Sequence, residues 1–163
     1  MAVVFNADEI LTMAQEIERS GAAFYRSAAR IVRGASSLLL RIAGEEDKHL
    51  KLFQEMQRAA RGGGNDVEDD PDNAAAIYLR AYADRRVFAA PGDADAVFHG
   101  GESMEQVAAI AVGKEKDSIV FYVGMKQMVP FALGRDQLDA IIADEMRHIA
   151  WIEKAAHEGS GGA

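Results

Sequence analysis

Two segments of this sequence repeat one unusual pattern, in which a glutamate and a histidine three positions apart interrupt a helical stripe of apolar residues. At the alternating spacing of three and four that keeps side chains on one helix face, Glu46 and His49 interrupt the first stripe. Glu145 and His148 interrupt the second stripe at the equivalent positions. The apolar members of the two stripes are Leu39, Ile42, Phe53 and Met56, and Leu138, Ile141, Ile152 and Ala155. The pattern predicts that charged groups enter the core of a helical protein.

Two further segments share a second stripe, which carries one carboxylate and, two turns later, a tyrosine preceded by phenylalanine. Glu18 and Tyr25 occupy these positions in the first segment, and Glu115 and Tyr122 occupy them in the second. The offset between the two segments is constant along the whole stripe. We infer that the chain is an internal duplication of one helical hairpin, each copy contributing a Glu and then a Glu-x-x-His pair to the core.

The spacing of helix-starting and helix-ending residues predicts four long helices. They cover about residues 7–34, 36–61, 104–129 and 136–158. Asn6 is the predicted N-cap of the first helix, and Ser103 with Gln106 predicts a capping box at the start of the third.

An acidic connection over about residues 62–103, with a short helix near 74–84, separates the two hairpins. Two tight hairpins joined by a long crossover are the plan of a ferritin-like four-helix bundle. We therefore predict an all-α fold and a single domain over residues 1–163.

Composition narrows the range of functions. The 18 basic residues are outnumbered by 26 acidic ones, and the formal charge of -8 disfavours nucleic acid and anionic membranes as partners. No stretch is long and apolar enough for a membrane span, so we expect a cytoplasmic protein. Because the chain has no cysteine, any metal must be held by oxygen and nitrogen ligands.

Buried carboxylates need compensating positive charge, since each loses its hydration and repels the others. Two divalent ions would balance the four core glutamates without any lysine or arginine, and each histidine would offer a neutral imidazole nitrogen to one ion. The predicted metal ligands are therefore Glu18, Glu46, His49, Glu115, Glu145 and His148. We expect iron, with manganese as the alternative, because both metals accept carboxylate and imidazole ligands.

Two segments carry a family resemblance: residues 16–25, EIERSGAAFY, and residues 42–53, IAGEEDKHLKLF. They resemble the rubrerythrin family of ferritin-like di-iron proteins. Rubrerythrins proper append a cysteine-ligated rubredoxin module, so this chain is similar to a stand-alone, erythrin-like member. Ser118 stands where the resemblance implies a second glutamate, which places redox-linked ligand exchange in doubt.

The resemblance implies that two iron ions, bridged by Glu46 and Glu145, are oxidised by hydrogen peroxide or dioxygen and re-reduced by a separate electron-donor protein or small reductant. Three alternatives stay open: a ferritin-like ferroxidase, a dimanganese catalase and a metal-free helical interaction protein. Exposed crossover residues predict self-association, as a homodimer. These are Ile77, Tyr78 and Tyr82, and the neighbourhood of Phe88 and Phe98.

Two further residue pairs lie near the predicted ligands in the helical pattern. Tyr25 and Tyr122 are placed to donate a hydrogen bond to a ligand carboxylate across the bundle, which would tune the metal centre. Glu45 and Asp144 are placed to orient the imidazoles, although the pattern favours a surface position for both. The remaining histidines, His99 and His157, are not assigned to the site.

Overall fold

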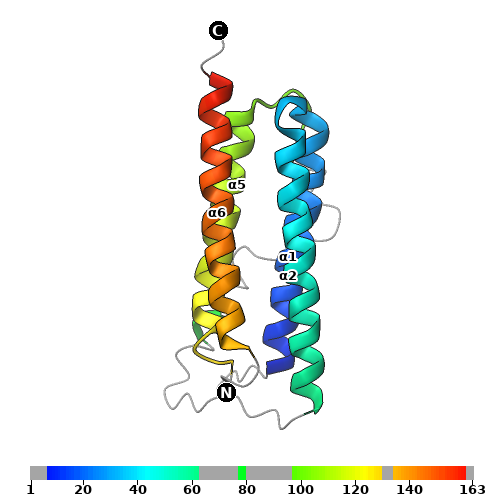
Figure 1. Cartoon of the computed structure of the whole chain (residues 1–163), viewed down its shortest axis with the longest axis vertical. Helices are drawn as coiled ribbons and strands as arrows, with labels where there is room; N and C mark the ends of the chain where they lie inside the picture. The colour runs from blue at the N-terminus through cyan, green and yellow to red at the C-terminus, as the bar shows by residue number, and fades with distance from the viewer. Residues whose placement is uncertain (1–6, 63–76, 80–96, 130–133, 161–163) are drawn as a thin grey trace.

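The computed structural model describes residues 7–62, 77–79, 97–129 and 134–160. Four long helices run side by side (Figure 1). Their bounds are α1 Ala7–Ile31, α2 Ser36–Gly62, α5 Met104–Met125 and α6 Arg135–Ser160, with a short 3-10 helix, η1 Arg33–Ala35, between the first two. The described residues include no strand. The predicted all-α, four-helix bundle is confirmed, with α1 packed mainly on α2 and α5 on α6.

Two helices end earlier than the sequence predicts. Val32, at φ -94° and ψ 80°, leaves the helical conformation, so α1 ends at Ile31 and η1 completes the turn. At the end of α5, Gln127 N–H donates to Gly124 O at 3.1 Å and Met128 N–H donates to Met125 O at 2.9 Å. These three-residue bonds tighten the chain just before Pro130, because a residue that precedes proline disfavours the helical conformation.

The predicted capping box of α5 is present. Ser103 N–H donates to Gln106 Oε1 at 2.9 Å, and Gln106 N–H donates to Ser103 Oγ at 3.3 Å. Other predictions fall outside the described residues, namely the N-cap Asn6, Tyr82, Phe88 and most of the crossover helix near 74–84. Within that last range, residues 77–79 are helical.

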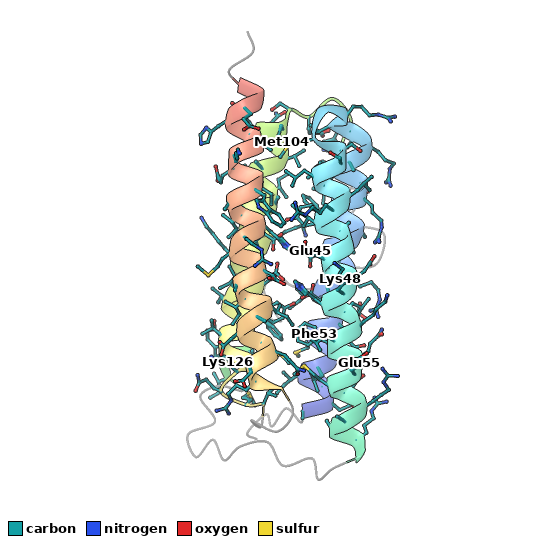
Figure 2. The ribbon with its side chains drawn as sticks, in the orientation of Figure 1. Glu45, Lys48, Phe53, Glu55, Met104 and Lys126 are labelled. Atoms are coloured by element: carbon teal, nitrogen blue, oxygen red, sulfur yellow. The ribbon has the colours of Figure 1, made fainter. Side chains whose placement is uncertain are left out.

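The hydrophobic core consists of two clusters that lie on either side of a polar zone. One cluster includes Phe53, Met56 and Leu138. The other includes Phe24, Leu39 and Ile152. Figure 2 shows Phe53 and Met104 toward opposite ends of the bundle, with Glu45 and Lys48 between them. The carboxylates and histidines of the repeated stripes are thus enclosed between two apolar layers.

The crossover residues differ in exposure. Phe98 is buried and its ring centroid lies 5.2 Å from that of Phe24, so its predicted exposure is wrong: an aromatic side chain beside an apolar helix end is covered by it. Ile77 is exposed, and Tyr78 donates a hydrogen bond to Val120 O at 2.9 Å. Among the described helices, none combines the length and apolarity that a membrane span requires.

Candidate metal centre

The structure brings all six predicted metal-binding side chains together in the polar zone between the two apolar clusters. They come from all four long helices, and each is at most 5% exposed. The six are Glu18 from α1, Glu46 and His49 from α2, Glu115 from α5, and Glu145 and His148 from α6. The helical spacing that places them on core stripes explains their convergence.

These side chains form two overlapping groups, each with one histidine and three carboxylates. The first group is Glu18, Glu46, His49 and Glu145, and the second is Glu46, Glu115, Glu145 and His148. Within each group, one potential ligand atom per residue lies within 4.8 Å of all the others. Glu46 and Glu145 belong to both groups, so the geometry suits two metal ions that share two carboxylates.

Glu145 illustrates this sharing at the level of single atoms. Its Oε1 lies 3.1 Å from His49 Nδ1, and its Oε2 lies 3.1 Å from His148 Nδ1. The two imidazole rings are inclined at 27° to each other, with centroids 6.1 Å apart. Each carboxylate oxygen of Glu145 is therefore directed toward a different half of the candidate centre.

Four buried polar atoms in the centre make no hydrogen bond with any described residue. They are Glu18 Oε2, Glu46 Oε1, His49 Nδ1 and Glu145 Oε1. Leaving a buried polar atom without a partner costs about 1–3 kcal/mol, and more where it carries charge. All four atoms are oxygen or nitrogen donors of the kind that iron and manganese accept. The donor set therefore fits a dinuclear metal centre.

The outer nitrogens of both histidines contact carboxylates from the opposite hairpin. His49 Nε2 lies 3.2 Å from Asp144 Oδ2, and His148 Nε2 lies 3.0 Å from Glu45 Oε2. If each Nε2 carries the proton and donates it, Nδ1 keeps a lone pair directed into the centre. The predicted surface position of Glu45 and Asp144 is thus corrected, because these side chains reach inward from the rim of the α2–α6 contact.

Two arginines contact the outer carboxylates Asp144 and Glu45, and a tryptophan lies beside one of these arginines and beside His148. Arg147 binds the carboxylate of Asp144, and Arg41 Nε lies 3.7 Å from Glu45 Oε1. The Arg41 guanidinium lies 3.9 Å from the centre of the Trp151 ring, whose centroid is 5.8 Å from that of His148. Sequence reasoning missed Trp151, since nothing in the stripe pattern distinguishes it from a core aromatic residue.

Removing one outer carboxylate is expected to weaken metal binding without abolishing it. Glu45→Ala frees the His148 ring to reorient, and losses of this kind cost about 10–100-fold in affinity. Titration with Mn²⁺, followed by the fluorescence of Trp151, the single tryptophan of the chain, measures the change. Glu55→Ala, at an exposed position on α2, is the matched control. Unchanged affinity in Glu45→Ala would rule out an orienting role for this carboxylate.

The two predicted tyrosines each donate a hydrogen bond to a core glutamate of the other hairpin. The Tyr25 hydroxyl donates to Glu115 Oε1, and the Tyr122 hydroxyl donates to Glu18 Oε1. Burial raises the pKa of both phenols well above the ordinary value, and the neighbouring carboxylates add to the effect. Both phenols therefore stay protonated at neutral pH and act as donors.

In the absence of metal, the surroundings favour the protonated forms of several of these side chains. Burial, with the charge of Glu18, raises the pKa of Glu46 well above its ordinary value, and burial raises the pKa of Glu115 to about 8. Burial disfavours the charged form of His49, yet its contacts with Glu145 and Glu18 raise its pKa to about 11. Metal ions binding here would displace these protons, because imidazole and carboxylate must be deprotonated to ligate.

Burial and contacts within the cluster also shift the pKa values of His148 and Glu145, one upward and the other downward. Burial opposes the charged forms of His148 and Glu145. Contacts with Glu115, Glu145 and Glu46 nevertheless raise the pKa of His148. Burial and the charge of Glu46 would raise the pKa of Glu145, but its contacts with His148 and His49 lower it overall. Glu145 is thus better placed to stay ionised than Glu46 or Glu115.

The residues that the sequence does not assign to the site contribute no ligand to either group. His99 and His157 are exposed, away from the two groups. Ser118 is half-buried, and its hydroxyl donates to Lys114 O at 3.1 Å along its own helix. No carboxylate stands at this position, so the departure from the rubrerythrin pattern remains.

The fold and the cluster together define a ferritin-like protein with a candidate dinuclear carboxylate centre. A comparison with protein-family models matches the Rubrerythrin family over residues 9–156. The chain therefore belongs to the rubrerythrin family.

One solved structure with a similar fold comes from Thermotoga maritima and carries the provisional description of a ferritin-like diiron-carboxylate protein. The TM-score is 0.67 at 21% sequence identity, and the match covers 94% of this chain and 96% of that chain. At this identity the likeness concerns the fold. A search of curated proteins finds no significant match.

Proposed function

We propose that this protein is a non-haem di-iron oxidoreductase that reduces hydrogen peroxide or dioxygen, with electrons supplied by a separate protein or a small reductant. The observation that carries the proposal is the pair of overlapping ligand groups that share Glu46 and Glu145. Membership of the rubrerythrin family supports it, since members of that family are typically oxidoreductases.

Six side chains would hold the metal ions: Glu18, Glu46, His49, Glu115, Glu145 and His148. When bound, a di-ferrous pair supplies two electrons, which together with two protons reduce one hydrogen peroxide to two waters. Iron is the metal of the proposal because the ligands are carboxylate and imidazole without sulfur, and manganese is the alternative with the same preference.

The chain's own groups prepare the site for such chemistry. The apolar clusters above and below limit the access of water, which strengthens electrostatic interactions inside. Tyr25 and Tyr122 hold one oxygen each of Glu115 and Glu18 and so fix the direction of these carboxylates. Glu45 and Asp144 hold the two imidazoles in place.

Peroxide turnover distinguishes the proposal from its rivals. The iron-loaded protein is expected to consume hydrogen peroxide only while a reductant such as ascorbate is present, with one two-electron reductant oxidised per peroxide and no oxygen released. Release of one dioxygen for every two peroxides without reductant would instead identify a catalase. Oxidation of Fe²⁺ that ends with iron retained by the protein would identify a ferroxidase. Absence of any peroxide consumption by the metal-loaded protein would contradict the proposal.

A further inference from the structure

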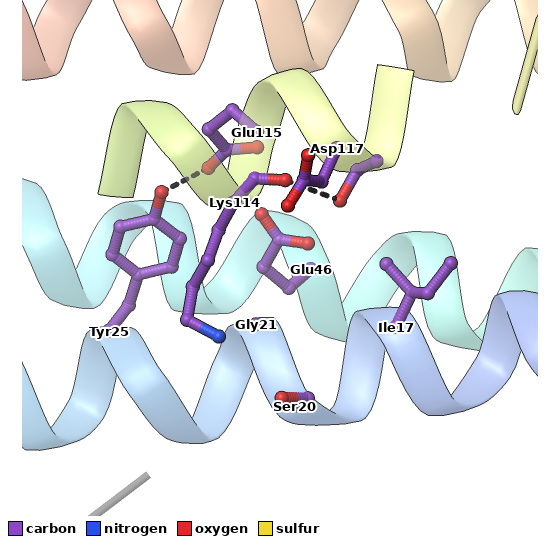
Figure 3. Close-up of a pocket in the computed structure, with 9 residues that line it drawn as sticks. Ile17, Ser20, Gly21, Tyr25, Glu46, Lys114, Glu115 and Asp117 are labelled. Carbon is purple, nitrogen blue, oxygen red and sulfur yellow. Dashed lines mark hydrogen bonds between the residues drawn. The ribbon is translucent and has the colours of Figure 1, made fainter. Parts of the chain in front are cut away.

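The two faces of the bundle that flank the candidate centre differ in how they are closed. On the α2–α6 face, Glu45 and Asp144 contact the histidines, and Arg41 covers Trp151. On the opposite face, between α1 and α5, a pocket reaches the centre (Figure 3). The centre is thus accessible from the α1–α5 face.

The pocket leads from partly exposed polar residues to two carboxylates of the candidate centre. Its lining residues are Ile17, Ser20, Gly21, Tyr25, Glu46, Lys114, Glu115, Asp117 and Ser118. Figure 3 shows Glu46 and Glu115 on facing helices, with Lys114 extended between Tyr25 and Gly21. Ser20 and Asp117 are half-buried, whereas Glu46 and Glu115 are almost completely buried. A solute that enters past Ser20 and Asp117 therefore meets the two glutamates.

Two small residues at equivalent positions of the duplicated hairpins keep the pocket open. Gly21 follows Glu18 by three residues, and Ser118 follows Glu115 by three. A Cβ atom at Gly21 would lie 3.2 Å from Glu46 Oε2, so any side chain there would fill the space in front of that carboxylate. The Ser118 hydroxyl turns back onto Lys114 O of its own helix and leaves the pocket free.

The pocket has room for a small solute. Its cavity volume is about 50 Å³, and a cavity needs roughly 10–15 Å³ to hold one water. A solute as small as hydrogen peroxide or dioxygen therefore has room in the pocket. The lining offers a hydroxyl, an ammonium group and carboxylates, which suit a solute that forms hydrogen bonds.

We propose that the α1–α5 pocket is the entrance through which the oxidant reaches the candidate centre, and that the small residues Gly21 and Ser118 keep this entrance open. The inference rests on the proposed function for the identity of the oxidant, but the entrance itself rests on the pocket.

The test compares a blocked pocket with an open one at the same position. Ser118→Leu fills the pocket, and Ser118→Ala keeps it open while removing the hydroxyl. Ser20→Leu narrows the outer end from α1, and Gly113→Leu places a leucine on the exposed surface of α5, where nothing lies within 4 Å. Metal content and Trp151 fluorescence establish that each variant holds its ions.

The readout that does not depend on turnover is the rate at which azide binds to the iron-loaded protein, followed by optical absorption. Ser118→Leu or Ser20→Leu is expected to slow azide binding and peroxide consumption by roughly tenfold or more, since a misplaced side chain of this size costs about that factor in a fitted site. Gly113→Leu should match the wild type, and Ser118→Ala should not show the slowing expected of Ser118→Leu.

The outcomes separate the entrance from the proposed function. Azide binding at the wild-type rate in both Ser118→Leu and Ser20→Leu would overturn the entrance. If azide binding depends on Ser118 and Ser20 but the wild type consumes no peroxide, the entrance is supported and the proposed reaction fails. Because Ser20 contributes to neither ligand group, its variant tests the entrance even if Ser118→Leu does not fold.

Discussion

Replacing Glu46 by alanine is expected to abolish the binding of both metal ions, whereas replacing Glu18 is expected to remove one. Glu46 and Glu145 are the described residues that belong to both ligand groups, while Glu18 belongs to one. Loss of a shared carboxylate removes a ligand from each ion and leaves His148 Nδ1, 3.3 Å from Glu46 Oε1, without that neighbour. We expect a loss of affinity beyond the about 10–100-fold typical of outer residues.

Elemental analysis after loading with Fe²⁺ or Mn²⁺ measures this effect as ions per chain. Glu46→Ala and Glu145→Ala should hold almost none, and Glu18→Ala should hold about half of the wild-type content. His148→Ala should also lose metal, whereas His99→Ala and Glu55→Ala are controls at exposed positions. Equal losses in His99→Ala and Glu46→Ala would refute the assignment of the centre, and so would full occupancy in Glu46→Ala.

Metal loading is expected to raise the Tm of the wild-type protein by roughly 10 °C or more. A ligand at about 1,000 times its Kd stabilises the native state by about 4 kcal/mol. For a domain of this size, each 1 kcal/mol shifts Tm by about 2–4 °C. The buried carboxyls of Glu46 and Glu115 supply the reason, because without metal they must take up protons to be buried, whereas bound ions compensate their charge directly. Thermal unfolding in chelator and in Mn²⁺ measures the shift.

The substitution Glu46→Gln should stabilise the metal-free protein and remove the stabilisation by metal. A carboxyl whose pKa is raised on folding destabilises the folded state once the pH exceeds its ordinary pKa, so Glu46 costs stability at pH 7 in the metal-free protein. The neutral, similarly shaped glutamine removes that cost. The Tm in chelator should therefore rise above that of the wild type, while the metal-induced increase disappears. A lower Tm in chelator, with the metal response intact, would contradict the charge-balance account of this centre.

Much of the architecture could be predicted because residues at spacings of three and four lie on one helix face, and the apolar stripes therefore indicate which faces are buried. Glu46 and His49 lie on the same face as Leu39 and Phe53, so their entry into the core follows from helical geometry alone. The capping box at Ser103 likewise follows from local sequence. The exact helix ends could not be predicted, since Val32 and the turn before Pro130 depend on backbone angles that many sequences permit.

The roles of Glu45 and Asp144 could not be read from the stripes either. Both residues lie beside a core position, where helical spacing places the backbone at the surface. Their side chains nevertheless cross the α2–α6 contact to reach a histidine of the opposite helix. The pocket at Gly21 was equally hidden, because it depends on the distance between α1 and α5 rather than on either helix alone.

The crossed contacts of Glu45 and Asp144 make the two repeats mutually dependent. Each repeat contributes the carboxylate that orients the other repeat's imidazole, and each tyrosine hydroxyl likewise binds a glutamate of the other repeat. A single hairpin that paired with a copy of itself could satisfy these contacts only by symmetry. Because both repeats lie in one chain, a substitution in one half can be compensated in the other, so equivalent positions around the shared centre need not be identical: Gly21 corresponds to Ser118, and Glu45 to Asp144.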